Sequence, residues 1–187
     1  SEEGAYVDGV SNGPWTQRTP EGVWNGPYVL GAKSGTWTLE KEGRRIAEDT
    51  WANDRRDGPE RRWAGDTLVK ECGWRAGMES GACRTWAPDG TPQQLWTWAV
   101  GKLHGAFSTW HDDGSLAQRG AMADDQHHGA FESWHANGRP AARGSYDAGS
   151  PVGAWTWWHD NGVVERKGTY GPDGTEHDVW VERFPSG

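Results

Sequence analysis

The sequence predicts an all-β protein: an elongated, single-layer antiparallel meander of about seven β-hairpin repeats. A period of 22–24 residues, a composition rich in Trp and Gly, and turn dipeptides in phase with that period all indicate this class. The 187 residues include 28 Gly and 15 Trp, but only 21 are Leu, Ile, Val or Phe. Glycine inside a helix costs about 1 kcal/mol, which disfavours helical bundles. Large aromatic side chains bury on the order of 150–250 Å² each and can replace the missing aliphatics.

The repeat is clearest in residues 105–114, which return in similar form at 129–138 and 153–162. A large side chain begins the second half of each repeat, and it recurs at steps of 22, 23, 23, 24, 24, 24 and 24 residues. These positions are Tyr6, Tyr28, Trp51, Trp74, Trp98, Met122, Tyr146 and Tyr170. The pattern predicts one continuous array over 4–180, followed by a C-terminal tail over 181–187.

The turns within the repeats are marked by dipeptides that accept positive φ and close two-residue hairpins. They are Asp89-Gly90, Asp113-Gly114, Asn137-Gly138 and Asn161-Gly162. Each repeat is therefore expected to contain two short strands and a tight turn, with a slightly longer turn leading to the next repeat.

Strand alternation divides the side chains between two faces of the predicted sheet. The first, which we call the packing face, carries about two large apolar groups per repeat and is expected to be buried. Its members are Trp15, Tyr28, Trp37, Trp51, Trp74, Trp98, Phe107, Met122, Phe131, Tyr146 and Trp155. The second, the ladder face, carries one Trp per repeat, at Trp63, Trp86, Trp110, Trp134 and Trp158. Arg119 and Arg143 are expected diagonally beside Trp110 and Trp134.

A symmetric turn between repeats places Trp74 opposite Gly81, Tyr146 opposite Gly153, and Cys72 opposite Cys83. Opposed residues of antiparallel strands have Cα atoms about 4.5–5.5 Å apart, which suits a disulfide. The alternative is two free thiols that fill the space of a glycine–aromatic pair. A disulfide would imply an oxidising compartment, the periplasm or the cell surface, whereas free thiols would leave the cytoplasm as the location. Because the chain begins at Ser1 rather than Met, we expect it to be a processed or trimmed product.

The repeat unit resembles MORN repeats, on the strength of Gly105-Ala-Phe-Ser-Thr-Trp110, Asp113-Gly114 and the aromatic-x-x-Gly-x-x-x-Gly segment that follows. It is most similar to the bacterial variant labelled as the antitoxin component of toxin–antitoxin modules. The resemblance implies an elongated hairpin array that serves as a protein- or membrane-association scaffold, and the antitoxin label implies a partner protein. This chain is unusual in its acidity and its Trp content.

Charge and motifs exclude several functions. A net charge of −8 argues against nucleic-acid binding and against docking on anionic membranes, and no apolar run is long enough for a membrane span.

The in-phase residues His111, His135 and His159 would lie about 9.5 Å apart, too far to share a metal, and are expected at strand ends beside turns. No nucleophile, phosphate-loop or cofactor motif is present. The paired arginines at 55–56 and 61–62 are interpreted as a solvated rim.

The sequence thus predicts a non-enzymatic scaffold without metal or cofactor that binds another protein. The candidate binding residues are Trp63, Trp86, Trp110, Trp134, Trp158, Arg119 and Arg143. Two interpretations of the Trp ladder stay open: a binding strip, since five exposed indoles exceed what monomers usually leave open, or packing covered by Arg stems. The alternative ligand is a polysaccharide or cell-wall glycan. The period of 24 residues counts against it, because the Trp- and Gly-rich hairpin repeats that bind such ligands have a period of about 20 residues. A lipid surface is disfavoured by charge.

Overall fold

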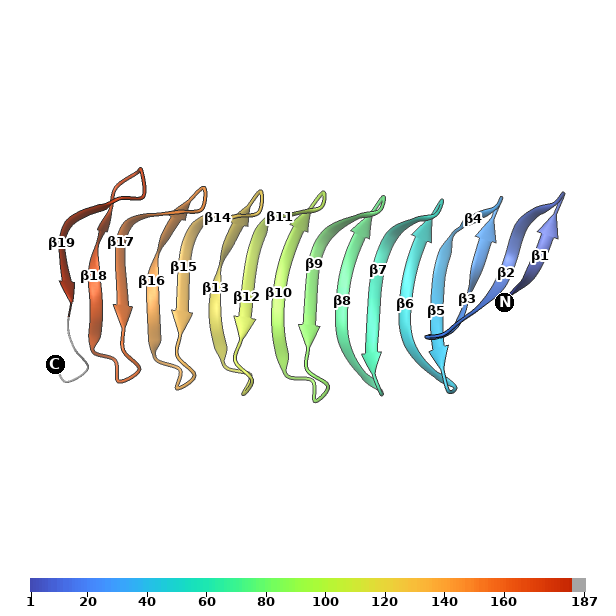
Figure 1. The fold of residues 1–187 in the computed structure, drawn as a ribbon, viewed down its shortest axis with the longest axis horizontal. Coiled ribbons are helices and arrows are strands. Elements are labelled where there is room, and N and C mark those ends of the chain that lie inside the picture. The colour runs from blue at the N-terminus through green and yellow to red at the C-terminus, as the bar shows by residue number, and fades with distance from the viewer. Residues whose placement is uncertain (183–187) are drawn as a thin grey trace. The chain divides into compact units, whose positions relative to one another are not determined.

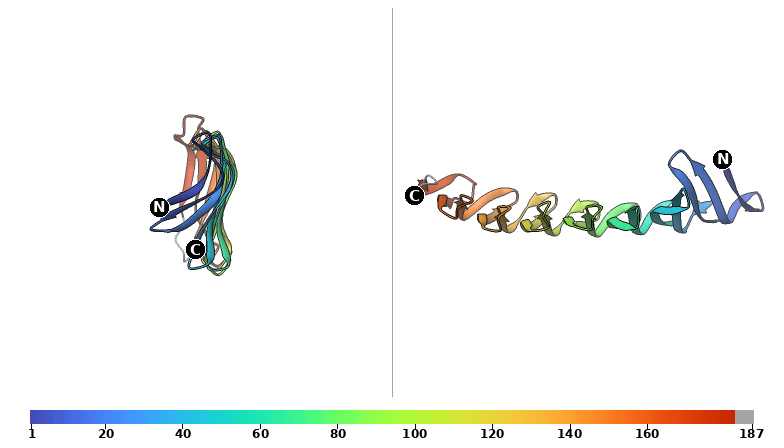
Figure 2. Two further views of the ribbon diagram at one scale, coloured as in Figure 1. Left: turned by 90° about the vertical axis from the view of Figure 1, so that its right-hand side faces the viewer. Right: turned by 90° about the horizontal axis from the view of Figure 1, so that it is seen from below.

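The computed structural model describes residues 1–182, with side chains up to residue 177. It is all-β, as predicted, and the described residues contain no helix. The strands fall into two compact units. The N-terminal unit comprises residues 1–90 and 99–101, and the C-terminal unit comprises 91–98 together with the chain from residue 102 onwards. Within each unit the strands form a single-layer antiparallel meander (Figures 1 and 2).

The N-terminal unit contains β1 (Glu2–Val7), β2 (Val10–Thr19), β3 (Gly22–Val29), β4 (Ala32–Lys33), β5 (Gly35–Lys41), β6 (Arg44–Ala52), β7 (Arg55–Ala64), β8 (Thr67–Arg75) and β9 (Met78–Trp86). The C-terminal unit contains β10 (Pro92–Ala99, whose last residue groups with the N-terminal unit), β11 (Lys102–Leu103), β12 (Gly105–Trp110), β13 (Leu116–Ala123), β14 (Gln126–His127), β15 (Gly129–Trp134), β16 (Pro140–Asp147), β17 (Ser150–Trp158), β18 (Val164–Tyr170) and β19 (Glu176–Glu182). Strand β19 extends two residues into the predicted tail, and 183–187 lie outside the described residues.

In the C-terminal unit the two kinds of turn are the reverse of those predicted, whereas in the N-terminal unit the turns inside the repeats have two residues, as predicted, for example between Ala64 and Thr67. The two-residue turns of the C-terminal unit join successive repeats, as at Asp124 and Asp125, whose φ angles are both positive at 49° and 68°. The Asp113-Gly114 turn is longer: the Gly114 N–H donates to the His111 carbonyl, and φ is positive only at Gly114. This is the hairpin in which a turn is completed by a glycine bulge. Asp113 acts instead through its carboxylate, which accepts hydrogen bonds from the Ser115 N–H and hydroxyl.

Hydrogen bonds tie neighbouring repeats along both edges of the C-terminal unit. At one edge the Asp125 N–H donates to the Leu103 carbonyl, and the Leu103 N–H donates to the Asp125 carboxylate at 2.8 Å. At the other edge His111 Nε2 lies 2.9 Å from the Trp134 carbonyl oxygen. A carbonyl oxygen can only accept, so Nε2 of this histidine carries the proton. These ties hold each hairpin in register with the next.

The register between repeats is only partly as predicted. Cys72 lies opposite Cys83, but Trp74 pairs with Glu79 rather than Gly81. Tyr146 likewise pairs with Pro151 rather than Gly153. In both pairs of strands a β-bulge shifts the register just before this position. The predicted partners, Gly81 and Gly153, both have positive φ. The prediction of a symmetric turn fails because the bulge places two extra residues on the second strand of each pair, β9 or β17.

The packing face holds the buried core. Trp15, Trp37, Phe107 and Trp155 are at most 5% exposed. Each of these rings covers bare backbone on the neighbouring strand: a Cβ added at Gly26 would overlap the Trp37 ring. Phe131 and the aromatics at the other predicted packing positions are half-buried rather than buried, apart from Met122, which is buried. Several of them make ring-to-ring contacts along this face, as Phe131 does with Tyr146, edge to face.

Deletion of one whole repeat tests this architecture. Removal of residues 105–128 joins His104 to Gly129, and His104 and His128 make equivalent backbone hydrogen bonds to Thr97 and Ala121. Because each repeat contacts only its neighbours, we expect a folded, shorter protein with the β-sheet circular dichroism retained. Insertion of twelve residues after Thr109, inside β12, should abolish the cooperative melting transition. Loss of all β signal on the clean deletion would contradict the repeat assignment.

Candidate functional site

Three tryptophans of the predicted ladder lie in equivalent places in the C-terminal unit. Trp110, Trp134 and Trp158 are the last residues of β12, β15 and β17, and all three are half-buried. Each pairs with an apolar residue on the following strand, as Trp134 does with Pro140. The corresponding partners of Trp110 and Trp158 are Leu116 and Val164. The ladder is thus a row of partly accessible indoles separated by smaller apolar side chains.

A row of charged side chains runs beside this ladder on the same face. The register aligns Ser108, Arg119, Glu132, Arg143, Thr156 and Lys167 across successive strands. Glu132 forms ion pairs with both Arg119 and Arg143. The side chain of Glu132 is only 16% exposed, whereas those of Arg119 and Arg143 are 57% and 71% exposed. The row therefore presents mainly positive charge to solvent.

The two arginines hold Glu132 in its ionised form. Hydrogen bonding from Arg119 lowers the pKa of Glu132 most, and Arg143 adds to this through a hydrogen bond and its charge, against a smaller raising effect of burial. The Glu132 carboxylate thus remains charged below its ordinary pKa of 4.5. The ion-pair row is expected to persist in mildly acidic solution.

The register places the arginines diagonally beside the ladder, as predicted: Arg119 lies opposite Ser108, two residues before Trp110, and Arg143 lies opposite Glu132, two residues before Trp134. The Arg119 guanidinium also reaches the ladder residue of the next hairpin and lies over the Trp134 ring, 5.3 Å from its centroid. The reason is the pairing of Arg119 with Glu132 on β15, which draws its side chain toward the next hairpin. Arg143 is held by the same carboxylate, with its Nε 2.9 Å from Glu132 Oε1.

Two hollows lie on this face. One, of about 120 Å³, is lined by Glu132, Ser133, Trp134, Pro140, Ala142, Arg143 and Trp158, and so lies between two ladder positions. The other, of about 360 Å³, is lined by Ala106, Phe107, Ser108, Arg119, Gly120, Ala121, Ala130 and Glu132. Both share Glu132, so the charged row separates an aromatic hollow from one bordered by alanines.

The N-terminal unit repeats the arrangement on its own ladder face. Trp63 and Trp86 are half-buried there, and the Arg45 guanidinium lies 4.7 Å from the Trp63 ring centroid. Arg61 forms ion pairs with Glu48 at 2.7 Å and with Glu71 at 2.8 Å. Alternating charge beside half-buried Trp is thus common to both units.

The histidines that follow the ladder are structural. His111, His135 and His159 come directly after β12, β15 and β17, at strand ends as predicted. His135 Nε2 lies 2.7 Å from the Trp158 carbonyl oxygen, as His111 does from that of Trp134. In the part of the chain with described side chains, no three His, Cys, Asp or Glu residues gather closely enough to hold a metal ion.

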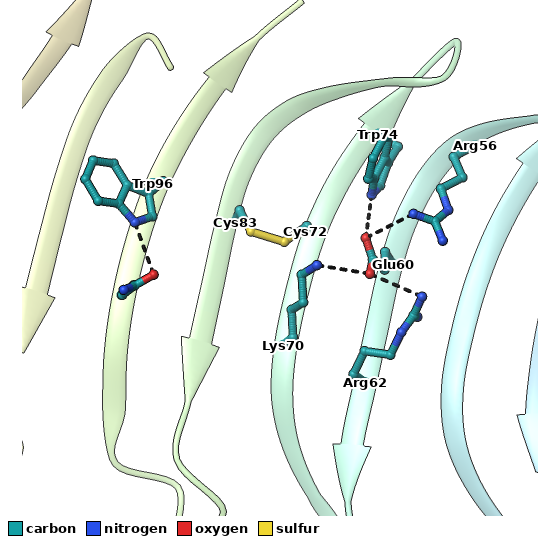
Figure 3. Close-up of a disulfide and its surroundings, with 9 residues drawn as sticks. Arg56, Glu60, Arg62, Lys70, Cys72, Trp74, Cys83 and Trp96 are labelled. Carbon is teal, nitrogen blue, oxygen red and sulfur yellow. Dashed lines mark hydrogen bonds and ion pairs between the residues drawn. A yellow bond between two sulfur atoms is a disulfide. The ribbon is translucent and has the colours of Figure 1, made fainter. Parts of the chain in front are cut away.

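A buried ion-pair network occupies the packing face of the N-terminal unit (Figure 3). Asp49 and Glu60, only 2% and 4% exposed, pair on β6 and β7. Arg56 and Arg62 each contact both carboxylates, with the closest approach 2.6 Å between Arg62 Nη1 and Asp49 Oδ1. Figure 3 shows Glu60 at the centre of these contacts.

Glu60 has two further partners besides the arginines. Lys70 Nζ lies 3.1 Å from Glu60 Oε1, and the Trp74 indole N–H donates to Oε2 at 2.8 Å. Arg56, Arg61 and Arg62 are therefore ion-pair partners of buried and half-buried carboxylates, and their interpretation as a solvated rim is wrong. Only Arg55 of the four is exposed.

This network predicts a pH dependence. Burial is the largest single influence on Glu60 and raises its pKa. The hydrogen bonds from Trp74 and Lys70 and the charges of Arg62 and Lys70 together outweigh it, so the pKa lies below the ordinary 4.5. The unfolded chain then takes up the proton first as the pH falls. The stabilisation is complete above about pH 4.5 and is lost as the pH falls through the lowered folded pKa.

Glu60→Gln removes that titration, so its free energy of unfolding should change less with pH than that of the wild type. Urea unfolding at about pH 6 and about pH 3.5 compares the two slopes. Equal losses of stability in wild type and variant over this interval would show that Glu60 does not contribute as described.

The packing face of the N-terminal unit also carries a disulfide. Cys72 and Cys83 are directly opposed on β8 and β9, and their sulfur atoms are bonded (Figure 3). The Cα atoms are 3.9 Å apart, closer than the typical spacing on which the prediction relied. Cys72 is 1% exposed. The bond continues the cross-strand row that begins with Trp37, Asp49 and Glu60.

Reduction of this bond should lower the free energy of unfolding by about 2–3 kcal/mol, because the disulfide closes a short loop in the unfolded chain. Denaturation with and without reductant measures the loss. Intact mass after alkylation shows whether the thiols are free. Two alkylated thiols in protein isolated without reductant from its native compartment would contradict the disulfide.

Sequence reasoning missed Glu132 and the pair Asp49 and Glu60. A signal for the pair exists in the repeat itself. The packing-face positions that hold Gly120 and Phe131 become Cys72 and Cys83 two repeats earlier, and Asp49 and Glu60 three repeats earlier. Carboxylates at positions otherwise filled by glycine and aromatic residues indicate a local change of core chemistry.

Comparison with known proteins agrees with the repeat. Residues 151–170, which span most of β17 and all of β18, match the family described as MORN repeat variant. No curated protein matches the chain. In the described residues no helix has the length and apolar character needed to cross a membrane. The hairpin of β17 and β18 therefore supports a MORN-type repeat, a class of scaffold that generally mediates interactions.

Proposed function

We propose that the protein is a non-enzymatic repeat scaffold that binds another protein along the ladder face of its C-terminal unit. The observation that carries the proposal is the row of half-buried tryptophans beside a row of ion-paired arginines, with a hollow between Trp134 and Trp158. Tryptophan and arginine are the side chains most enriched at the energetic centres of protein interfaces. The MORN-type repeat supports a scaffold role.

The difference in side-chain burial between the two faces supports the same proposal. Burial and ring-to-ring contact are concentrated on the packing face, where Phe107 and Trp155 are 1% and 3% exposed. The ladder residues of the C-terminal unit are all half-buried, as are packing-face aromatics such as Phe131 and Tyr146, but none of the ladder residues is buried. Folding thus leaves indole surface on the ladder face that a partner can cover.

Two more specific proposals, on the kind of partner and on the location of the protein, each rest on one observation. An antitoxin-like role, in which the partner is a toxic protein, rests on the resemblance of the repeat to the bacterial MORN variant. A location outside the cytoplasm, in the periplasm or at the cell surface, is supported by the Cys72–Cys83 disulfide, since such bonds persist in oxidising compartments.

A pull-down from the source organism tests the proposal. The double variant Trp110→Ala/Trp134→Ala should lose the captured partner, whereas Trp157→Ala should retain it. Trp157 is a matched control because it precedes Trp158 in β17 and its side chain lies on the packing face, stacked on Trp155. Equal capture by wild type and double variant would refute binding through the ladder.

A glycan is the second candidate ligand. The half-buried indoles and the shallow hollow beside Trp134 and Trp158 also suit the apolar faces of sugar rings. A glycan array probed with wild type and Trp110→Ala/Trp134→Ala separates the candidates. Ladder-dependent glycan binding without a captured protein would replace the protein-scaffold proposal with this one.

A further inference from the structure

The distance between successive ladder tryptophans favours one backbone conformation in a bound partner segment. Equivalent residues of successive hairpins are two strands apart, which corresponds to about 9.4–9.8 Å at the usual strand separation. A polyproline II helix rises about 3.1 Å per residue and has three residues per turn, so every third residue returns to the same side after about 9.3 Å. In an extended strand only every second residue faces the same side. Two residues advance about 6.6–6.8 Å and four about twice that, so neither distance matches the spacing of the ladder.

The hollow between two ladder positions suits the side chain that such a helix would present. It holds about 120 Å³ and is lined by Trp134, Pro140 and Trp158. One ordered water needs only about 10–15 Å³ by such a measure, so a five-membered ring fits. Aromatic-lined grooves are also the surfaces on which proline-rich segments dock in other recognition modules.

The charged row defines what lies beside the prolines. It runs parallel to the ladder: on β12, β15 and β17 its positions lie two residues before each Trp and therefore about 7 Å away, and Arg119 and Arg143 lie on the strands between them. The side chains that reach solvent are Arg119 and Arg143, while Glu132 between them is largely covered. Carboxylates on the partner would meet these guanidinium groups, and lysines would be repelled.

We propose that the ladder face of the C-terminal unit binds a proline-rich, acidic segment in the polyproline II conformation. The segment runs along the array with a proline at every third residue over Trp110, Trp134 and Trp158, and with its carboxylates toward Arg119 and Arg143. This inference rests on the proposed scaffold function and specifies its partner. The conformation suits a single-layer face, because the segment is already extended and loses little entropy on binding.

Isothermal titration of the full chain with blocked twelve-residue peptides tests the proposal. The probe is (Pro-Pro-Glu)4, compared with (Pro-Pro-Lys)4, which reverses the charge, and (Gly-Ser-Glu)4, which keeps the charge without the helix. We expect binding of the first peptide at least about tenfold tighter than that of either control. No binding of (Pro-Pro-Glu)4, or equal binding of (Gly-Ser-Glu)4, would overturn the proposal.

Variants then locate the site. Trp134→Ala/Trp158→Ala should weaken binding of (Pro-Pro-Glu)4 by at least about tenfold, and Trp157→Ala should leave it unchanged. Arg143→Glu, at an exposed position, should weaken the same peptide severalfold, and thermal melting of each variant checks that it is folded. Unchanged affinity in both Trp134→Ala/Trp158→Ala and Arg143→Glu would overturn the site.

The outcome is distinguishable from failure of the scaffold function. If the pull-down depends on Trp110 and Trp134 but (Pro-Pro-Glu)4 does not bind, the scaffold stands and the polyproline occupant is wrong. If a glycan binds through the ladder while the peptide does not bind and no protein is captured, both the occupant and the protein-scaffold proposal are wrong.

Discussion

Trp155→Ala is expected to lower the free energy of unfolding by about 3–5 kcal/mol, the usual cost of truncating a buried aromatic in a core. Trp155 is 3% exposed, its ring covers the backbone of Gly144, and its indole N–H donates to the Ser145 carbonyl at 3.1 Å. Its removal leaves a cavity against Tyr146 and Trp157 and removes the hydrogen bond to the Ser145 carbonyl. Urea denaturation followed by circular dichroism measures the change.

The matched variant is Trp158→Ala, three residues further along β17 and on the ladder face. Because Trp158 is half-buried, we expect its truncation to cost about 1 kcal/mol, well below the loss for Trp155. An equal loss for the two variants would mean that the ladder is part of the packing. The assignment of the ladder as a binding strip would then fail.

Glu60→Ala should lower the free energy of unfolding by about 3 kcal/mol, because it removes one of the two carboxylates that Arg56 and Arg62 contact and the carboxylate that Lys70 contacts. Glu60 is 4% exposed and contacts Arg56, Arg62 and Lys70. The side chains of Arg56 and Arg62 are 31% and 28% exposed, so solvent screens part of their charge and keeps the loss at the lower end of the range for buried pairs.

Glu71→Ala is the matched control on the next strand. Glu71 pairs with Arg61 at 2.8 Å on the ladder face and is 32% exposed, so its loss should cost less than about 1 kcal/mol. Chemical denaturation of both variants under identical conditions gives the comparison. A loss for Glu60→Ala no larger than that for Glu71→Ala would show that the network on the packing face does not stabilise the fold.

The repeat made the fold class predictable. Gly, aromatic and turn positions hold one phase from Tyr6 to Tyr170, and strand alternation then assigns the two faces. Trp37, Phe107 and Trp155 are buried on the predicted packing face. The opposition of Cys72 and Cys83 followed from the same register.

The turns and the local register were less predictable. Positive φ at Asp124 and Asp125 is imposed by the two-residue connection between strands, although no glycine marks it. The Asp113-Gly114 dipeptide carried the stronger turn signal but forms the longer hairpin, because the Asp113 carboxylate bonds to Ser115 rather than leaving the backbone to turn at once. Bulges such as the one between Cys72 and Trp74 depend on packing that the period does not encode.

The chemistry of the candidate site was predicted in part. Trp134 and Arg119 are in contact on one face, but the residue that orients the arginines, Glu132, was missed. The predicted register already places Glu132 opposite Arg119, because the two residues adjoin the equivalent positions Phe131 and Gly120, and the observed pairing of β13 with β15 agrees. The Asp49 and Glu60 network was missed because its arginines, taken alone, resemble ordinary surface charge.

The central claim is that the packing face stabilises the protein while the ladder face is left for a partner. Hydroxyl-radical footprinting of the free chain and of the complex captured in the pull-down tests it most directly. We expect Trp110, Trp134 and Trp158 to be oxidised in the free protein and protected in the complex, with Trp37 and Trp155 unreactive in both. Ladder tryptophans that are unreactive in the free protein, or protection confined to Trp157 and Tyr170 on the packing face, would contradict the account.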